Sequence, residues 1–282
     1  MMENIGWRSL ESRQFYVMKL SIITINYNNA HGLQRTLDSV ARQFFADLEY
    51  IVVDGNSKDD SLKCLSVFEE KWNAGISRVG TFRWISEPDT GIYNAMNKGI
   101  RMAKGDYCLF LNSGDYLANK DTLQQVFSDF PFGKDIVYGH QWNEVDGRLQ
   151  EEVCIDVAYI TFDTLRNAHI PHQSTFIRRE ALNALGGYSE EYRIISDWAF
   201  VMKGLFKLDY TIARIPQFVS VYDTTGISST ADKAPQWQQR ADFLHKEFPL
   251  FMPDYERWDR LNKNVYMKLI RWLRQCKHIL HI

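Results

Sequence analysis

Short apolar segments, polar turns and stretches of helical periodicity follow one another repeatedly between residues 20 and 117. The first apolar segment is LSIITINY, and YIVV, FRWIS and YCLFL recur at intervals after it. Their apolar residues run almost continuously instead of alternating, which is typical of strands covered on both faces. Strands that alternate with helices predict an α/β fold: a doubly wound, mostly parallel sheet with helices on both faces.

The later segments predict a mixed set of elements. We expect a hairpin that turns at Asp146 and Gly147, a strand and helix that end at Gly186 and Gly187, and a strand pair in 209–223. Helices are expected over 235–251 and 254–282. The sequence therefore predicts a main domain over 18–231 and a C-terminal helical extension over 232–282. Residues 1–17 precede a second methionine, and we interpret them as a start-site artefact or a loose arm.

Composition excludes several classes of protein. The formal net charge of -2 gives no general attraction to nucleic acid. The cysteines are far apart and match no zinc or disulfide pattern. We find no run of the about 18 to 20 apolar residues that a membrane span needs, and the N-terminus lacks the order of a signal peptide. These features favour a cytoplasmic protein.

Polar residues follow each of the first four predicted strands. They are Asn26, Tyr27 and Asn28; Asp54, Asn56 and Ser57; Glu87 and Asp89; and Asn112 to Asp115. Ligands of such sheets bind outside the carboxyl ends of the strands, so we expect these side chains around one crevice. No GxGxxG follows the first strand and no GxxxxGK[ST] occurs, which argues against a dinucleotide oxidoreductase and a P-loop NTPase.

The order of motifs resembles the inverting family-2 glycosyltransferases with the GT-A fold, over about residues 18–230. LSIITINYNN is similar to their opening strand, YIVVDGNSKDDS to their VVDDGSxDxT turn, and NAMNKGIRMAKGDYCLFLNSGD to their ARNxGixxAxGeyixfLDxDD segment. EPDTGIYNAMNKGI, FLNSGD, HQSTF and SDWA resemble the branch that includes the colanic acid glycosyltransferases of exopolysaccharide assembly.

The resemblance implies a nucleotide site with Tyr27 stacked on the base and Asp54 as its hydrogen-bond acceptor. The alternatives are that Tyr27 packs on the core and that Asp54 satisfies its own turn. Gly55 stands where many relatives carry a second aspartate. The other residues expected on the donor side are Asn26, Asn28, Asn56, Ser57, Asp89, Asn94, Asn97, Lys98 and Asn112.

The resemblance also implies a Mg²⁺ or Mn²⁺ ion that neutralises charge on the leaving diphosphate. In the family's Asp-x-Asp motif, Asn112 replaces the first aspartate and Gly114 the second, so Asp115 is the only carboxylate. We expect a weakened metal site at Asp115, with part of the coordination moved to Asp89 or another residue. The alternative is that NSGD is an ordinary turn.

A base must take the proton of an acceptor hydroxyl, and the resemblance assigns this role to Asp197. Ser196 replaces the glutamate that usually precedes it. The alternative is an aspartate that stabilises a helix start. On the acceptor side we expect His172 and Gln173, each weighed against a structural role, and a lid over YDTTGISST with Gly226 as hinge and Ser228 as donor.

The C-terminal stretch from Val265 carries apolar residues at helical spacing and basic residues between them, with no acidic residue after Asp259. A helix of this kind either lies on an anionic membrane surface or docks on the main domain.

The sequence therefore predicts a metal-assisted, inverting transferase. It would move a sugar from a nucleotide diphosphate donor to a hydroxyl of a glycan, expected to be lipid-linked, in exopolysaccharide, capsule or lipopolysaccharide synthesis at the inner membrane surface. Two alternatives stay open: an enzyme whose acceptor is a polyprenyl phosphate, and a non-catalytic nucleotide-sugar-binding partner in an assembly complex.

Overall fold

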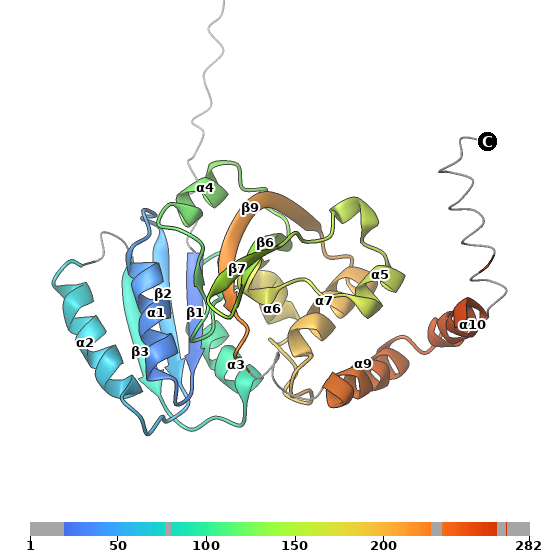
Figure 1. The fold of residues 1–282 in the computed structure, drawn as a ribbon, viewed down its shortest axis with the longest axis horizontal. Helices are drawn as coiled ribbons and strands as arrows, with labels where there is room; N and C mark the ends of the chain where they lie inside the picture. The colour runs from blue at the N-terminus through green and yellow to red at the C-terminus, as the bar shows by residue number, and fades with distance from the viewer. Residues whose placement is uncertain (1–19, 77–79, 227–232, 264–268, 270–282) are drawn as a thin grey trace, which may run out of the picture.

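The computed structural model describes residues 20–76, 80–226, 233–263 and 269 (Figure 1). Three predictions concern residues outside these ranges: those for residues 1–17, for Ser228 and for the amphipathic stretch from Val265. Leu269 is the one described residue of that last stretch, and it is exposed. No helix among the described residues combines the length and apolarity needed to span a bilayer.

One curved sheet runs through the molecule in the order β3-β2-β1-β4-β8-β6-β9-β5, and β7 pairs with β6 (Figure 1). The first four strands of this order are parallel, β8 is antiparallel to both of its neighbours, and β6 is parallel to β9. The predicted α/β fold is confirmed, with a mixed second half. The strands are β1 Leu20–Asn26, β2 Leu48–Asp54, β3 Thr81–Ser86, β4 Tyr107–Phe110, β5 Tyr116–Leu117, β6 Ile136–Val145, β7 Arg148–Glu152, β8 Thr175–Arg178 and β9 Ile212–Asp223.

Helices cover both faces of the sheet because its strands present apolar side chains on both. In β1, Leu20 and Ile22 belong to one buried cluster, while Ile23 and Ile25 belong to the other. The first cluster is completed by α1 Ala30–Ala41, α2 Ser61–Asn73 and α4 Thr122–Ser128. The second is completed by α3 Ile92–Met102, α6 Arg179–Ala184, α7 Ser196–Lys207 and α9 Lys233–Glu247.

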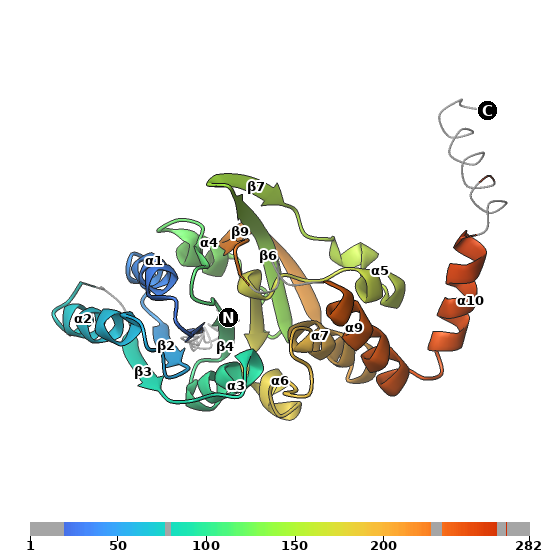
Figure 2. The same ribbon diagram turned by 60° about the horizontal axis from the view of Figure 1, so that its bottom comes forward.

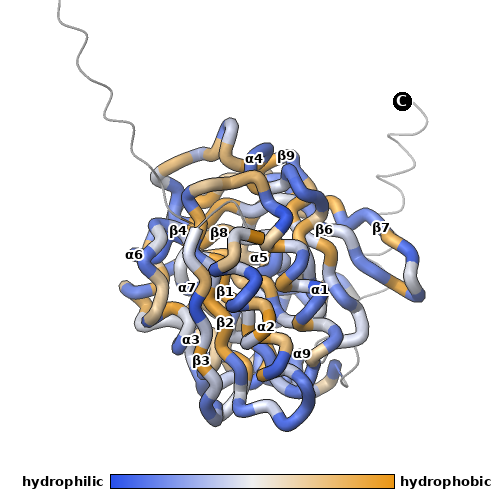
Figure 3. The backbone as a smooth tube through the Cα atoms, turned by 90° about the vertical axis from the view of Figure 1, so that its left-hand side faces the viewer, coloured by the Kyte–Doolittle hydropathy of each residue, from blue (hydrophilic) through white to orange (hydrophobic). Residues whose placement is uncertain are grey.

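The predicted hairpin is confirmed as β6 and β7, with φ of 49° at Asp146 and 72° at Gly147 in the turn. β7 is exposed and polar at the edge of the molecule (Figure 3). The predicted strand pair in 209–223 is wrong, because β9 is a single strand of 12 residues. Pro216 of β9 falls within a register shift against β6, where its missing N–H interrupts no regular ladder bond.

The C-terminal helices pack on the main body. Phe243 and Leu244 of α9 lie in the same core as Trp198 of α7, and Figure 2 shows the two helices side by side. In α10 Met252–Lys263, Tyr255 stacks on Phe162, with ring centroids 5.1 Å apart. Phe162 begins α5 Phe162–Asn167, which with the 3-10 turns η1 Val157–Tyr159 and η2 His172–Ser174 connects β7 to β8.

Candidate functional site

The carboxyl ends of β1, β2 and β3 meet at Asp54, which is fully buried. Its carboxylate accepts hydrogen bonds from Asn26 Nδ2 at 2.8 Å, from the Ser57 hydroxyl and N–H at 2.5 and 2.9 Å, and from Ser86 Oγ at 2.7 Å. Burial alone would raise the pKa of Asp54, but the bonds from Ser57, Ser86 and Asn26 lower it. The two roles expected for Asp54 are contact with a nucleotide base and satisfaction of its own turn. These hydrogen bonds correspond to the second role, because they hold its own loop.

Asn28 and Asn56 belong to the same pair of loops. Both have positive φ, 49° and 62°. The Asn28 N–H donates to Ser57 Oγ at 2.8 Å, and its side chain accepts from the Lys58 N–H at 2.7 Å. Asn56 accepts from Lys58 Nζ at 3.0 Å. These contacts fix the β1 and β2 loops against one another.

Asp89 and the exposed Tyr27 lie beside these loops, next to the buried Gly55. Tyr27 is 66% exposed, so the alternative of a core aromatic is excluded. A Cβ at Gly55 would lie 2.5 Å from Asp89 Oδ2 and 3.2 Å from Tyr27 Cδ2. Asp89 therefore reaches into the space in front of Gly55, while its other oxygen accepts from the Gly91 N–H at 2.9 Å. An aromatic face and a carboxylate oxygen are available there to a planar ligand.

Asn94, Asn97 and Lys98 make contacts within the protein, so their expected place on the donor side stays a prediction. Asn94 and Asn97 donate to Glu190 at 2.9 Å, and Asn97 also donates to the Tyr188 carbonyl. Lys98 bonds to the Pro88 carbonyl and pairs with Glu87 at 2.9 Å. The reason is helical phase: α3 directs Ile92, Tyr93 and Met96 toward the cavity described below, and these three residues toward neighbouring loops.

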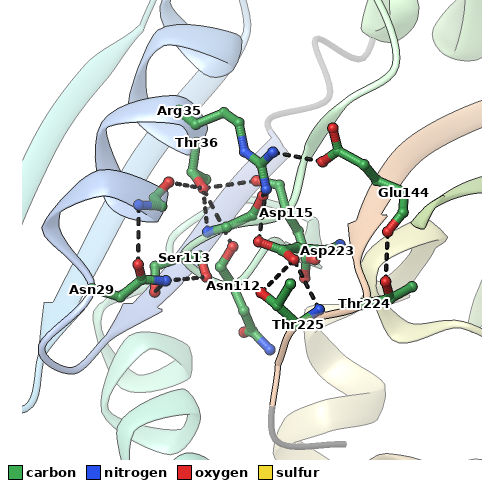
Figure 4. A network of polar contacts seen from close by, with 12 residues as sticks. Asn29, Arg35, Thr36, Asn112, Ser113, Asp115, Glu144, Asp223, Thr224 and Thr225 are labelled. Atoms are coloured by element: carbon green, nitrogen blue, oxygen red, sulfur yellow. Dashed lines mark hydrogen bonds and ion pairs between the residues drawn. The ribbon is translucent and has the colours of Figure 1, made fainter. Parts of the chain in front are cut away.

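The NSGD turn after β4 buries Asp115, which is 4% exposed (Figure 4). Asp115 Oδ1 accepts from the Asp223 N–H at 2.9 Å, and the Asp115 carbonyl accepts from Thr36 Oγ1 at 2.7 Å. Burial raises the pKa of Asp115 to about 7, although the Asp223 N–H opposes the shift. Few hydrogen bonds compensate the buried charge of this carboxylate, so it is suited to bind a cation.

Arg35 holds the NSGD turn against the ends of β6 and β9, and no sequence motif predicts this role. Its guanidinium lies 2.6 Å from Glu144 and 2.8 Å from Asp223, and donates to the Gly114 carbonyl at 2.6 Å (Figure 4). Asp223 in turn accepts from the Thr225 N–H and hydroxyl. Gly226 follows, with its N–H bonded to the Asp223 carbonyl at 3.3 Å. One arginine thus connects Asp115 to the segment expected to form a lid.

Asp197 lies at the start of α7 between two side chains that orient it. Tyr93 Oη donates to Asp197 Oδ1 at 2.8 Å, and His172 Nδ1 lies 3.3 Å from Oδ2. Burial opposes ionisation of Asp197, but the contacts with His172 and Tyr93 lower its pKa. Burial likewise opposes the charge on His172, while Asp197 raises its pKa. Tyr93 was missed by the sequence analysis although it lies within the EPDTGIYNAMNKGI motif.

His172 also connects Asp197 to the end of β4, because its Nε2 lies 3.1 Å from Asn112 Nδ2. Asn112, His172, Gln173 and Asp197 line one cavity of about 550 Å³. Gln173 is 4% exposed and sits in the wall. Tyr27, Asp54, Asp89 and Asp115 do not line this cavity.

A divalent cation would have few protein ligands in this site. No group of three or more His, Cys, Asp or Glu side chains suited to a metal occurs among the described residues. Asp115 fits the role of a single carboxylate ligand, because its Oδ2 accepts no hydrogen bond from a described residue and burial disfavours its charge. Phosphate oxygens and water would supply the remaining ligands, as they commonly do for Mg²⁺.

Two curated relatives are similar to this chain over most of its length. An uncharacterized glycosyltransferase of Mycobacterium tuberculosis is 31% identical over 236 residues, which cover 82% of this chain and 85% of the relative. The PGL/p-HBAD biosynthesis glycosyltransferase of Mycobacterium bovis is 35% identical over 182 residues, 64% of this chain and 67% of the relative.

Solved structures share the fold. The Staphylococcus aureus TarS fragment 1-349 in complex with UDP-GlcNAc superposes with a TM-score of 0.61 at 22% identity, over 79% of this chain and 64% of that chain. A mannosyltransferase of Pyrobaculum calidifontis in complex with GDP-Man and Mn²⁺ gives a TM-score of 0.56 at 18% identity, over 80% of this chain and 61% of that chain. This chain therefore spans less than two thirds of either structure.

The family model described as Glycosyl transferase family 2 matches residues 21–186, which hold the donor-side loops and the NSGD turn. The resemblance to the colanic acid branch stays a prediction. The match to the family model, the curated relatives and the GT-A-like arrangement of strands lead to the same conclusion: this chain belongs to glycosyl transferase family 2 and is a glycosyltransferase.

Proposed function

We propose that this enzyme transfers a sugar from a nucleotide diphosphate-sugar to a hydroxyl of a glycan or lipid-linked acceptor, with inversion at the anomeric carbon. The observation that carries the proposal is the placement of Asp197. Its carboxylate lines a cavity, is oriented by Tyr93 and His172, and has a lowered pKa, so it is ionised at neutral pH. Such a group fits a general base.

The reaction is a single displacement. The acceptor oxygen forms a bond to the anomeric carbon as the bond to the diphosphate oxygen breaks, and Asp197 takes the hydroxyl proton. The diphosphate leaves with the bonding electron pair, on the face opposite to the attack. Tyr93 and His172 keep the carboxylate in place during the transfer, and the walls formed by Pro171, Ile195 and Trp198 limit access of water that would hydrolyse the donor.

For the donor, we propose that Tyr27 stacks on the base and that Asp89, instead of Asp54, accepts its N–H. Asp54 has its donors inside the protein, whereas Asp89 Oδ2 faces the exposed ring of Tyr27 across Gly55. Fold neighbours named in complex with UDP-GlcNAc and with GDP-Man support a nucleotide-sugar donor.

A Mg²⁺ or Mn²⁺ ion held by Asp115 would neutralise charge that develops on the leaving diphosphate. Arg35 and the Asp223 N–H position this carboxylate. The complex of the mannosyltransferase neighbour with Mn²⁺ supports the choice of metal. Attachment to an anionic membrane through the stretch from Val265, and a cytoplasmic location, stay predictions.

The first test is a thermal-shift screen of nucleoside diphosphates and their sugars, with and without Mn²⁺, because a ligand of the native state raises the melting temperature. We expect one base to be preferred and its shift to grow with Mn²⁺. Asp197→Asn should keep this shift and lose about 10²- to 10⁴-fold in turnover. Asp129→Asn, which changes an exposed carboxylate beyond α4, is the matched control and should keep full turnover. Absence of any nucleotide shift contradicts the proposal.

Two other functions give different results. A polyprenyl phosphate acceptor is already ionised, so an Asp197→Asn enzyme that keeps its turnover would favour it. A non-catalytic nucleotide-sugar-binding protein would bind the donor and show no Mn²⁺-stimulated donor hydrolysis. The named roles of relatives in PGL/p-HBAD biosynthesis and in poly(ribitol-phosphate) modification favour an enzyme that acts on a glycan or glycolipid.

A further inference from the structure

The cavity beside Asp197 has a wall whose chemistry the transfer reaction itself does not require. Helix α9 contributes Lys233, Gln236, Trp237 and Arg240 to it. These positions follow the i, i+3, i+4, i+7 spacing of one helix face. Such a face normally carries apolar residues when it turns inward, as Phe243 and Leu244 do in the second half of the same helix. The first half of α9 instead presents two cations, an amide and an indole to the cavity.

Arg240 is the most unusual of these residues because it is a buried cation that forms no salt bridge with a described carboxylate. It is 7% exposed, and its one hydrogen bond within the described part of the chain goes from Nη1 to the Ala168 carbonyl at 3.3 Å. Its Nε is buried and has no hydrogen-bond partner among the residues that the structure describes. No salt bridge to Arg240 exists among the described residues. A guanidinium has five N–H donors, so most of its capacity is unused here.

Two indoles hold the guanidinium in position. The Arg240 Cζ lies 4.7 Å from the ring centroid of Trp198 and 5.2 Å from that of Trp237. Cation–π contacts of this kind stabilise a guanidinium by less than the burial of its charge destabilises it. Burial accordingly lowers the pKa of Arg240, although the charge of Asp197 opposes the shift. The aromatic contacts orient the cation without compensating its charge.

Two further polar atoms of the cavity wall lack partners. Asn112 Oδ1 and Gln141 Oε1 are both buried and accept no hydrogen bond from a described residue. Amide oxygens without donors suit the hydroxyl groups of a sugar, whereas a guanidinium with a single long hydrogen bond and no described ion pair suits an anion. The unmet needs of this cavity are therefore those of a polyhydroxylated ligand that carries a negative charge.

We propose that this cavity binds the acceptor, and that the acceptor bears an anionic group which pairs with Arg240. The inference rests on the proposed function, since it places the acceptor beside the base Asp197. Lys233, two helical turns before Arg240 on the same face, adds positive charge at the cavity. A phosphate and a carboxylate both meet the requirement, because each accepts two parallel hydrogen bonds from a guanidinium.

The test compares a neutral sugar with sugars that carry an anionic group. Tryptophan fluorescence of the full chain, which includes Trp198 and Trp237 beside Arg240, is titrated with glucose 6-phosphate, glucuronate and glucose, and with inorganic phosphate. EDTA and a saturating nucleoside diphosphate keep the anions from the donor site. We expect at least one charged sugar to bind tenfold or more tightly than glucose. A preference for glucose 6-phosphate indicates a phosphate-bearing acceptor, and a preference for glucuronate indicates a carboxylate-bearing one.

Arg240→Gln should remove the preference for charge and leave glucose binding unchanged. Arg240→Lys, which keeps the charge but not the planar fork, should retain part of it. Lys246→Gln makes the same change of charge on the far end of α9, where Lys246 pairs with Glu191 at the surface, and should have no effect. If Arg240→Gln does not fold, the wild-type comparison of charged and neutral sugars still decides the question.

Three outcomes would overturn the inference. The first is that charged and neutral sugars bind the wild type equally. The second is that the preference for charged sugars survives Arg240→Gln. The third is that Arg240→Gln weakens binding of the nucleoside diphosphate instead of binding of the charged sugar. In each of these cases nucleotide binding by the wild type is measured separately. Failure of this inference is therefore distinguishable from failure of the proposed transfer reaction.

Discussion

His172 Nδ1 lies 3.3 Å from Asp197 Oδ2, and the two side chains reach the site from different elements, the η2 turn before β8 and the start of α7. His172 also faces Asn112 at the end of β4. One imidazole thus joins the proposed base to the strand end that precedes Asp115. We expect this contact to influence how the activity of the enzyme depends on pH.

His172→Asn should move the acid limb of the pH profile. Asp197 is ionised because its contacts with His172 and Tyr93 outweigh the effect of burial, which raises its pKa. Without His172 the pKa of Asp197 rises, so kcat/KM should begin to fall at a higher pH than in the wild type, while activity well above that pKa is largely kept. The measurement is kcat/KM from pH 4 to 9 for both proteins.

The same experiment tests whether His172 is itself the base. In that case His172→Asn would lose activity at every pH, with no displacement of the profile. Tyr93→Phe provides a comparison, because it removes the other hydrogen bond to Asp197 and should shift the acid limb in the same direction.

Arg35→Met should impair the site without changing a group that contacts substrate. The substitution removes the ion pairs with Glu144 and Asp223 and the bond to the Gly114 carbonyl, so the turn that holds Asp115 loses its support. We expect turnover to fall about tenfold and the Mn²⁺ concentration needed for half activity to rise, with a loss of unfolding free energy of about 1 kcal/mol because the pairs are partly exposed.

One further variant separates the geometry of Arg35 from its charge, and another serves as a control. Arg35→Lys keeps the charge but cannot make the forked contacts, so it should resemble Arg35→Met in Mn²⁺ dependence. Arg42→Met removes an exposed arginine at the end of the same helix and should behave as the wild type. Normal Mn²⁺ dependence in both Arg35 variants would exclude the positioning role.

Gly55→Ala should weaken the nucleotide donor. Its Cβ would lie 2.5 Å from Asp89 Oδ2, so the Asp89 side chain must move away from Tyr27. Loss of one hydrogen bond of about 1 kcal/mol corresponds to about a fivefold rise in the Kd of the nucleoside diphosphate. Calorimetric titration of this variant and of Asp89→Asn measures the effect. If Asp89→Asn binds nucleotide as the wild type does, the proposed base contact is wrong.

Glu49→Gln should destabilise the fold while leaving the site intact. Glu49 has a side chain 1% exposed and accepts from Ser21 at 2.6 Å, from Arg83 at 2.8 Å and from the N–H groups of Lys104 and Gly105 before β4. An amide cannot satisfy these donors equally, so we expect a loss of about 2 kcal/mol in unfolding free energy at pH 7. Urea unfolding measures it.

The pH dependence of Glu49→Gln follows from the sign of its pKa shift. Burial opposes ionisation, but the hydrogen bonds lower the pKa of Glu49 below the ordinary value of 4.5. The stabilisation from Glu49 is therefore present above about pH 4.5 and is lost as the pH falls through the lowered pKa of the folded state. The difference between wild type and variant should shrink in that range. A constant difference down to pH 3 would contradict this account.

The sequence by itself determined the α/β fold of the first half. Continuous apolar segments such as LSIITINY require cover on both faces, and the polar residues after each strand must then gather at one edge. It also determined the neighbourhood of the site, since Asp54, Asn112 and Asp197 all lie at the start or end of an element that the residue pattern predicts.

Only the tertiary structure decided which of these side chains are open to a ligand. Asp54 and Asp89 look alike in sequence, but Asp54 is enclosed by donors from three strand ends, while Asp89 faces Tyr27. The contacts of Asn94 and Asn97 with Glu190 follow from the phase of α3, which depends on how its apolar face packs. No local sequence motif marks Arg35 or Arg240, because each contacts segments more than seventy residues away in the sequence. Arg35 contacts Gly114, and Arg240 contacts Ala168. Contacts over such separations form only when the whole chain packs.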